Sequence, residues 1–363
     1  MRRIAVIVAL GSLVGAAPAW SADFTLRADH RVARYNDLVR FRGTLPTPGR
    51  VVLVRDGVVV GSTTASSGAF VFDLRVRLAG TYVARTTSTQ SAPVVVRVKP
   101  LFRSKVVGKR RLGHRVVVVG RLLPVRAGRL QFARSRVRVG GDGRFRIRLD
   151  TSSGPLVTGK FRLSPKAGYV RVGRRLRVRL AQPRLRIGSH GPAVRALKER
   201  LWDLGFALPG IDAGFGYRTY EAVLAFQKFH GLPRTGRIGN GLWRALWGAN
   251  RPRPRVKRGD YIEVDKSRQV LMEVRGGNVV RVVHVSTGAT GNTPVGTWRV
   301  YREVFGWDWI LYHPMYFLGG FAIHGYPSVP PWPASHGCVR VPMWIATALR
   351  ERWGHGSIVR VYA

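Results

Sequence analysis

The single cysteine of the 363-residue chain, Cys338, lies in the run Ser-His-Gly-Cys-Val-Arg at residues 335–340. A second histidine, His324, stands upstream in Ile-His-Gly. A cysteine reacts as its thiolate, so a catalytic cysteine needs a neighbour that lowers its pKa or takes its proton. The pattern therefore predicts a cysteine nucleophile with a histidine base. The competing interpretation is a small buried apolar residue beside two unrelated histidines, because free cysteine is among the most buried residue types.

The N-terminal residues bear on the state of this thiol. Residues 1–22 are typical of a secretory signal peptide: Arg2 and Arg3 precede the apolar run 4–14, and Ala-Pro-Ala at 17–19 offers a cleavage site. We expect an exported protein of the bacterial cell wall, periplasmic or extracellular, with no transmembrane span after signal removal. A lone cysteine in an exported chain is either an intermolecular link or a free reactive thiol. We expect a depressed thiol pKa and fast labelling of Cys338 at neutral pH.

The chain is strongly basic, with 62 Lys and Arg against 18 Asp and Glu and a formal net charge of +44. Export and the absence of a nucleic-acid motif argue against a nucleic-acid partner. An anionic envelope polymer or membrane surface is the partner class that the charge favours; the alternative is arginine-rich composition on solvated strand faces. The histidines lack partners at metal-ligand spacing, and no cofactor fingerprint is present, so neither a metal nor a cofactor is expected.

Two N-terminal segments alternate apolar and polar residues at the β period. In 23–100 the strand-like runs are 50–54, 69–76 and 94–98, with Asp-Gly and Ser-Gly turns between strands. Residues 101–182 repeat the plan with runs at 116–119, 136–139, 144–149 and 176–180, and they carry 23 Lys and Arg against Asp142 and Asp150. We interpret the two segments as β-sandwich-like repeats that act as a spacer.

Residues 184–248 have a helical period. The first helix starts near Pro192 and ends at Gly205, the second spans 219–230, and the third spans 241–246, which predicts a bundle of three short helices. The segments 185–194, 204–206, 212–216 and 225–227, with their glycine turns, resemble the three-helix peptidoglycan-binding domain. The Pro/Arg-rich residues 249–257 predict a semi-extended linker.

From residue 258 to 363 the pattern is mostly β. A hairpin is predicted from runs 269–274 and 279–285 around Gly-Gly-Asn, followed by Ser-Thr-Gly at 286–288 and Thr-Pro-Val-Gly-Thr at 293–297. A helix at 342–353 and a strand at 357–362 complete the chain. The hairpin, these two elements, the His-Gly dipeptide and the cysteine run resemble the L,D-transpeptidase catalytic domain in their order. The expected fold class is multidomain and mainly β, with two sandwich-like repeats, a three-helix bundle and a mostly β catalytic domain with a short helix.

The resemblance implies a cysteine acyltransferase of peptidoglycan biosynthesis and cell wall organization, which affects cell shape. It assigns Cys338 as nucleophile and His324 as base, with the Gly325 carbonyl orienting the imidazole. It also implies that backbone amides around His336, Gly337 and Cys338 form an oxyanion hole, while Ser335 and His336 shape the loop. The substrates it implies are peptidoglycan stem peptides: a tetrapeptide stem gives an acyl-enzyme, releases D-Ala and forms a 3-3 cross-link.

Three residues are candidates for binding the substrate. Arg340 could hold a substrate carboxylate through a two-pronged contact, or it could form a structural salt bridge. Tyr326 and Trp332 lie in the proline-rich loop 325–334 and could line the acceptor side, or they could only set the loop's shape. Two other functions remain open: an L,D-carboxypeptidase, in which water replaces the acceptor amine, and a non-catalytic protein that anchors to peptidoglycan.

Overall fold

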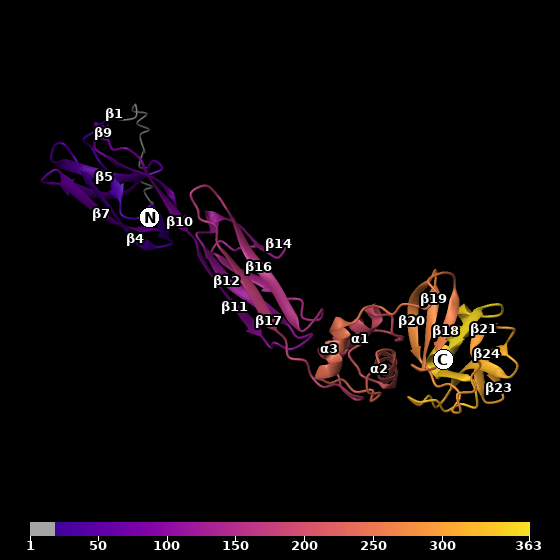
Figure 1. Cartoon of the computed structure of the whole chain (residues 1–363). Coiled ribbons are helices and arrows are strands. Elements are labelled where there is room, and N and C mark those ends of the chain that lie inside the picture. Colours follow the sequence, from indigo (N-terminus) through magenta and orange to yellow (C-terminus); the bar gives the residue numbers. More distant parts are fainter. Residues whose placement is uncertain (1–18) are drawn as a thin grey trace, which may run out of the picture. The chain divides into compact units, whose positions relative to one another are not determined.

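The computed structural model describes residues 19–363 and is mainly β, with four α-helices in that range (Figure 1). It contains the β-sheets of the two N-terminal repeats, the three-helix bundle and a C-terminal β domain with a short helix, so the predicted fold class is confirmed. The contacts divide the chain into two compact units. The first comprises residues up to 107 with 117–148 and 158–177, and the second comprises 108–116, 149–157 and 178–363. The proposed signal peptide falls almost wholly on residues 1–18, outside the described residues.

The first repeat is built from two sheets. One has the order β1-β9-β8-β10-β3 with β5 and β6 attached through β8, and the other has the order β2-β4-β7. Along β4, Val39 and Phe41 are buried while Arg40 is exposed, because successive side chains of a strand point to opposite faces. The strands are β1 Ala19–Trp20, β2 Arg27–Ala28, β3 Val32–Arg34, β4 Asp37–Thr44, β5 Gly49–Arg55, β6 Val58–Ala65, β7 Ala69–Val76, β8 Gly80–Arg85, β9 Thr89–Gln90 and β10 Val94–Lys99.

The second repeat pairs β11-β12-β15 in one sheet and β14-β13-β16-β17 in another. Phe145 and Phe161 pack together in its core, with ring centroids 5.6 Å apart. The predicted strand at 136–139 is wrong: β14 ends at Arg136, and Val139 makes only an isolated bridge to Phe145. The elements are β11 Leu101–Gly108, β12 Val116–Leu123, the 3-10 helix Val125–Ala127, β13 Gly128–Phe132, β14 Ser135–Arg136, β15 Arg144–Arg148, β16 Leu156–Pro165 and β17 Gly173–Arg179.

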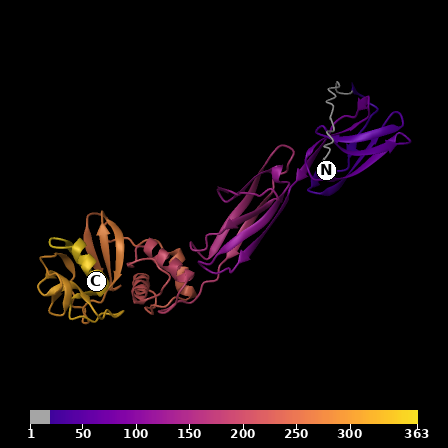
Figure 2. The same cartoon turned by 180° about the vertical axis from the view of Figure 1, so that it is seen from behind.

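Three helices follow, α1 Pro192–Asp203, α2 Tyr217–Phe229 and α3 Asn240–Gly248, so the predicted bundle is confirmed (Figure 2). Helix α1 begins at Pro192, where the missing proline N–H costs no hydrogen bond, and it buries the predicted face with Val194, Leu197 and Leu201. Helix α2 begins two residues before the predicted start. Its buried face includes Glu221 and Lys228 as well as apolar side chains.

The C-terminal domain has two five-stranded sheets around one apolar core. The first has the order β20-β19-β18-β27-β21, and the second has the order β22-β24-β25-β26 with β23 paired to β24. Helix α4, Met343–Arg352, contributes Ile345 and Leu349 to the core. The strands are β18 Tyr261–Asp265, β19 Val270–Arg275, β20 Asn278–His284, β21 Gly296–Arg299, β22 Arg302–Glu303, β23 Trp307–Asp308, β24 Leu311–Leu318, β25 Phe321–Tyr326, β26 Val339–Pro342 and β27 Ile358–Tyr362.

The helical bundle joins the edge of the first of these sheets through backbone hydrogen bonds. Val282 of β20 donates its N–H to the carbonyl of Gly205 at 2.8 Å, and Ala207 donates to the carbonyl of Val282 at 2.9 Å. Ala207 is also part of the apolar core of the C-terminal domain. An edge strand exposes unpaired backbone groups, so this pairing satisfies part of the β20 edge and ties the bundle to the sheet. None of the helices in residues 19–363 combines the length and apolar character that a membrane crossing requires.

One buried carboxylate, that of Glu273, is expected to stabilise the C-terminal domain. Glu273 of β19 is 1% exposed and accepts hydrogen bonds from Arg281 at 3.0 Å, Arg352 at 2.8 Å and the Trp353 indole at 2.8 Å. Glu273→Gln removes the charge and one acceptor, so we expect the free energy of unfolding to fall by about 3 kcal/mol. Urea unfolding followed by tryptophan fluorescence measures this, because every tryptophan except Trp20 lies at residue 202 or later.

The matched control is Asp260→Asn, which removes the partner of Arg275 at 2.9 Å, an ion pair whose aspartate side chain is 51% exposed. A surface pair of this kind contributes little to stability, because water and salt screen the two charges. Equal losses for the two variants would contradict a special role for the buried carboxylate.

Candidate active site

Two parallel strands bring the candidate nucleophile and base together. Strands β25 and β26 pair in parallel, with Ile323 opposite Val339 and His324 opposite Arg340. Cys338 immediately precedes β26. Its Sγ accepts a hydrogen bond from the N–H of Ala322 at 3.4 Å, and its S–H donates to the carbonyl of Gly320 at 3.6 Å. The thiol therefore lies beside the start of β25, and β25 is the strand that carries His324.

Burial and one hydrogen bond determine the protonation state of His324. The side chain is 2% exposed, and its Nδ1 lies 2.9 Å from the carbonyl oxygen of Gly325. Because a carbonyl only accepts, Nδ1 carries the hydrogen and Nε2 is left to accept a proton. Burial lowers the pKa of His324 to about 4, with the Gly325 contact opposing the shift and the charge of Arg340 adding to it. Above this pKa the imidazole is neutral, which is the form that a general base requires.

The expected depressed thiol pKa is wrong. Burial raises the pKa of Cys338 above its usual value, and the Ala322 hydrogen bond and the Arg340 charge offset this effect only in part. A neutral, buried histidine also supplies no positive charge that would stabilise a thiolate. The site therefore favours a neutral thiol at Cys338 and a neutral imidazole at His324.

The turn before Cys338 is held by hydrogen bonds of its own Ser335 and by one from Thr293, which lies outside the turn. Ser335 Oγ donates to the carbonyl of Cys338 at 2.6 Å and accepts from the N–H of Gly337 at 3.0 Å. Thr293 Oγ1 donates to the carbonyl of Gly337 at 2.7 Å. Because Ser335 already occupies the Gly337 amide, this amide is not open to an oxyanion. In residues 19–363 the amides of His336 and Cys338 have no backbone or side-chain acceptor, so these two are available.

Gly337 cannot be replaced without moving its neighbours. Its φ of 137° lies in the region that favours glycine, and a Cβ built on it would lie 2.4 Å from the ring of Phe321. His336 is exposed, and its carbonyl accepts from the Asn292 side chain at 2.8 Å. The turn is thus clamped through backbone groups, while the His336 imidazole is left at the surface.

The Ser-Thr-Gly segment pairs with the cysteine loop. Ser286 and Arg340 exchange two backbone hydrogen bonds of 3.1 and 2.9 Å. The carbonyl of Thr287 accepts from the N–H groups of Ala334 at 2.9 Å and Ser335 at 3.0 Å. Thr287 in turn is held by the side chain of Gln269, whose amide donates to Thr287 Oγ1 at 2.6 Å. This pairing fixes the path of the loop that ends at Cys338.

The three predicted substrate-binding residues lie at different depths. The guanidinium carbon of Arg340 stacks 4.1 Å from the ring centroid of Tyr326, and no carboxylate within residues 19–363 forms a salt bridge with it. The structure therefore gives no support to an internal salt bridge at Arg340. Trp332 is 60% exposed, and its carbonyl accepts from Ser286 Oγ at 2.7 Å.

Tyr326 also lines a cavity of about 480 Å³ between the helical bundle and α4. Glu221 of α2 faces this cavity, is 6% exposed and accepts from the Trp344 indole at 2.7 Å. Burial raises the pKa of Glu221 to about 7. The bundle therefore contributes polar side chains to a cavity next to the strand that carries His324.

Sequence reasoning missed several residues that support the site. Asn292 and Gln269 hold the loop through amide groups, and their roles are invisible without the register of the strands. Lys228 was detectable in principle: Leu224, Ala225 and Lys228 fall on one helical face, where a lysine among buried residues is unexpected. Within residues 19–363 no cluster of three or more histidine, cysteine or acidic side chains could hold a metal ion.

Comparison with known proteins defines the class of this fold and site. Residues 259–361 match the family described as L,D-transpeptidase catalytic domain, and residues 190–246 match the peptidoglycan binding domain family. The L,D-transpeptidase structure from Xylanimonas cellulosilytica is 38% identical, with a TM-score of 0.48, and the match covers 50% of this chain and 98% of that one. A comparison with curated proteins found no match.

Two further structures are more distant. The L,D-transpeptidase from Stackebrandtia nassauensis is 25% identical over 49% of this chain and 95% of that one, with a TM-score of 0.32. The L,D-transpeptidase from Mycobacterium smegmatis is 13% identical over 73% of this chain and 99% of that one, with a TM-score of 0.27. On the family match and the 38% identity, the chain belongs to the L,D-transpeptidase family, with a peptidoglycan-binding domain before its catalytic domain.

The raised thiol pKa and the lowered histidine pKa predict a particular pH profile. We expect the rate of Cys338 alkylation by iodoacetamide to keep rising between pH 7 and pH 9, because the thiolate fraction grows toward a pKa above the usual range of about 8.5. Mass spectrometry of the single cysteine measures the rate. Cys338→Ala reports the background. If the alkylation rate reached a plateau by pH 7, the thiolate would already be formed at that pH. This result would contradict a neutral Cys338 thiol beside a neutral His324 imidazole.

Proposed function

We propose that this chain is an exported peptidoglycan L,D-transpeptidase that uses Cys338 as its nucleophile. The observation that carries the proposal is the parallel pairing of β25 with β26, which brings the cysteine turn beside the strand of a buried, neutral His324. Family membership supplies the reaction class, and the peptidoglycan-binding domain supports the same substrate. The excess of positive charge in residues 24–182 favours an anionic envelope polymer as a second partner.

The reaction begins at a tetrapeptide stem. The Cys338 sulfur attacks the carbonyl carbon that precedes the terminal D-residue, while His324 Nε2 takes the thiol proton. The amides of His336 and Cys338 stabilise the oxyanion. The tetrahedral intermediate collapses, D-alanine leaves with the proton from His324, and a thioester remains. An amine of a neighbouring stem then attacks the thioester, gives its proton to His324 and releases the thiol, which leaves a 3-3 cross-link.

His324 is a better base than His336. The Gly325 carbonyl fixes the His324 tautomer with Nε2 free, the task that an aspartate performs in a serine triad. The His336 ring is exposed, and the contacts near it involve its backbone rather than its imidazole. We assign His336 and Ser335 to loop shape, and Arg340 to a substrate carboxylate, with Tyr326 beneath it as a stacking partner. Trp332 is exposed enough to contact an acceptor stem.

The decisive experiment incubates the purified full-length protein with a disaccharide-tetrapeptide and resolves the products by mass spectrometry. Dimer with free D-alanine supports transfer, whereas tripeptide alone means that water resolves the thioester and the protein is an L,D-carboxypeptidase. We expect Cys338→Ala and His324→Ala to lose activity by a factor of at least about 10² to 10⁴, because base and nucleophile act in the same step.

The matched control is His336→Ala, which removes the other histidine of the motif and should reduce the rate by less than about tenfold. Full activity of His324→Ala together with loss in His336→Ala would reverse the assignment of the base. No product from folded wild-type protein would leave peptidoglycan anchoring as the function.

A further inference from the structure

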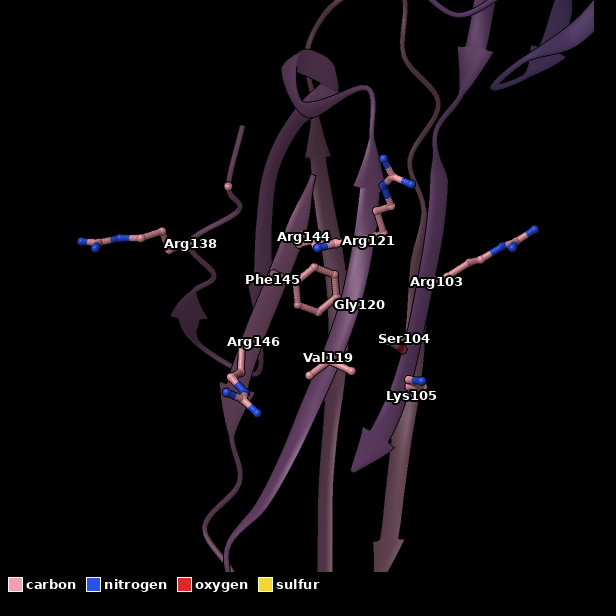
Figure 3. Close-up of a pocket in the computed structure, with 11 residues that line it drawn as sticks. Arg103, Ser104, Lys105, Val119, Gly120, Arg121, Arg138, Arg144, Phe145 and Arg146 are labelled. Carbon is pink, nitrogen blue, oxygen red and sulfur yellow. The ribbon is translucent and has the colours of Figure 1, made fainter. Parts of the chain in front are cut away.

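A basic groove is lined by strands β11, β12 and β15 of the second β repeat and by Arg138 and Gly140 beside them (Figure 3). Its volume is about 820 Å³. Phe145 and Gly120 lie at its centre, with Val119 beside them, and Arg103 and Arg138 extend outwards on opposite sides. Six of its lining residues are cationic and none is acidic; the six are Arg103, Lys105, Arg121, Arg138, Arg144 and Arg146.

The strand register concentrates like charges in this groove. Arg121 of β12 is directly opposite Arg144 of β15, and Arg146 is opposite Val119 on the same face. Like charges opposite one another destabilise a sheet unless a counter-charge is near. Asp142 supplies only one such charge, at 3.4 Å from Arg144. An anion bound in the groove would therefore relieve repulsion that the described part of the chain does not neutralise.

The shape and lining favour one chemical class of anion. Guanidinium groups present two parallel N–H donors that match phosphate oxygens, and the apolar floor of Val119 and Gly120 suits the carbon chain between successive phosphates. Phe145 is only 5% exposed, so the groove offers no aromatic surface on which nucleic-acid bases could stack. It also lacks the exposed aromatic anchors of membrane-surface binding.

We propose that this groove binds a linear phosphodiester polymer of the cell envelope. The inference deepens the envelope-polymer part of the proposed function, and its test needs no catalytic turnover, so failure of either can be recognised separately. Binding at this groove would hold the N-terminal repeats on the wall polymer, in addition to any contact made by the peptidoglycan-binding domain.

The test compares two triple variants of the full chain that have the same net charge. The groove variant is Arg103→Gln, Arg138→Gln and Arg146→Gln, three groove arginines that form no salt bridge with residues 19–363. The control is Arg162→Gln, Arg171→Gln and Arg177→Gln, three exposed arginines of the same repeat outside the groove. Affinity for a fluorescent poly(glycerol phosphate) should fall about tenfold in the groove variant and less than about threefold in the control.

Three further probes identify the ligand class: polygalacturonate, single-stranded DNA and phosphatidylglycerol vesicles. Tightest binding of the phosphodiester polymer, weakened as salt rises from 0.1 to 1 M, supports the proposal, because the screening length falls from about 10 Å to about 3 Å. Equal losses of affinity in the two triple variants would mean that net charge alone binds the polymer, and would overturn a specific role for the groove. Tighter binding of any other probe, or no polymer binding at all, would overturn the proposal.

A second observation lies at the junction of the helical bundle and the catalytic domain. Lys228 of α2 is 1% exposed, and its Nζ reaches three acceptors of the catalytic domain: the carbonyl of Gln269 at 3.2 Å, the carbonyl of Val285 at 2.7 Å and Nδ1 of His284 at 2.6 Å. Burial lowers the pKa of Lys228 well below its usual value. A desolvated lysine is costly unless its donors are satisfied, and here all three acceptors come from the neighbouring domain.

One branch of this network leads to the proline-rich loop. His284 Nε2 lies 2.7 Å from the carbonyl of Val329, so Nε2 carries the hydrogen and donates it. Burial and the neighbouring Lys228 lower the pKa of His284, which leaves Nδ1 bare to accept from Lys228. A neutral imidazole thus connects the lysine to the loop between His324 and Cys338. Arg234, also of the bundle, donates to the carbonyl of Pro331 in the same loop at 2.8 Å.

The other branch leads to the cysteine turn. Gln269, whose carbonyl accepts from Lys228, holds Thr287 with its side chain through bonds of 2.9 and 2.6 Å. Thr287 accepts from the backbone of Ser335, which in turn bonds the carbonyl of Cys338. Gln269 has a φ of 59°, an uncommon conformation for a residue other than glycine, so it depends on contacts that hold it in place.

We infer that Lys228 is a positioning residue for the segment 325–338, acting from the peptidoglycan-binding domain on the catalytic turn. The inference rests on the proposed function. It makes the helical bundle a structural part of the catalytic unit, in addition to any role in wall binding. Two points of this segment, Val329 and Ser335, are each connected to the Lys228 amino group through a chain of hydrogen-bonded residues.

The test is Lys228→Met, which keeps an unbranched side chain, one atom shorter, and removes all three hydrogen bonds. We expect kcat with the disaccharide-tetrapeptide to fall by about tenfold or more while KM changes less than about threefold, because the loop that carries the nucleophile shifts. The rate of Cys338 alkylation should also change by more than about twofold. The matched control is Lys198→Met, another buried lysine of the bundle, which pairs with Asp212 at 2.9 Å and forms no salt bridge with the described residues of the catalytic domain.

Unchanged kcat and alkylation in Lys228→Met, or the same changes in Lys198→Met, would overturn the inference. If Lys228→Met does not fold, His284→Phe severs only the branch to Val329 and should still alter the alkylation rate; an unaltered rate would equally overturn it. Alkylation needs no turnover, so this readout holds even if the proposed reaction proves wrong.

Discussion

The parallel pairing of β25 with β26 is the constraint on which the rest of the site depends. Parallel neighbours must be joined by a crossover, which usually takes a dozen residues or more. Here the connection runs from 327 to 338, at the lower limit of that length, and it ends on the cysteine itself. Cys338, the proposed nucleophile, therefore lies at the end of a short connection. The connection's prolines and its pairing with Ser286 and Thr287 hold that segment at one path, and the short separation of His324 and Cys338 follows from it.

The same enclosure decides the electrostatics of the site. Packing keeps water from His324 and in part from Cys338, so the neutral forms of both are favoured. A carboxylate as third member would favour the imidazolium, but the Gly325 carbonyl orients the ring with only a partial charge. The arrangement therefore avoids a standing ion pair and suits a proton transfer that accompanies attack.

The elements that sequence reasoning predicted well are those set by local chemistry. The hairpin followed from Gly-Gly-Asn, the first helix from Pro192 and Gly205, and the β repeats from alternation along each strand. The strand at 136–139 failed because its alternating residues have no long partner strand to pair with. The predicted direction of the Cys338 pKa shift was wrong, because the motif shows which charged residues are near the thiol but not that burial raises its pKa. The oxyanion hole stays a prediction, and the Ser335 contact that occupies the Gly337 amide could not be predicted because it depends on the turn's conformation.

The contacts between the helical bundle and the catalytic domain could not be predicted from the sequence. They show that the two domains are packed against each other rather than only joined by a linker. Residues 249–257 lie between the two matched domains, and their Pro/Arg composition alone predicts a semi-extended linker that separates them. Yet Gly205 and Ala207 extend the β20 edge, Trp344 reaches Glu221, and Lys228 is buried against His284. Each contact removes polar groups from water in a way that only the partner domain compensates, so separating the domains would expose unpaired donors on both sides. The helical bundle and the catalytic domain therefore form one structural unit.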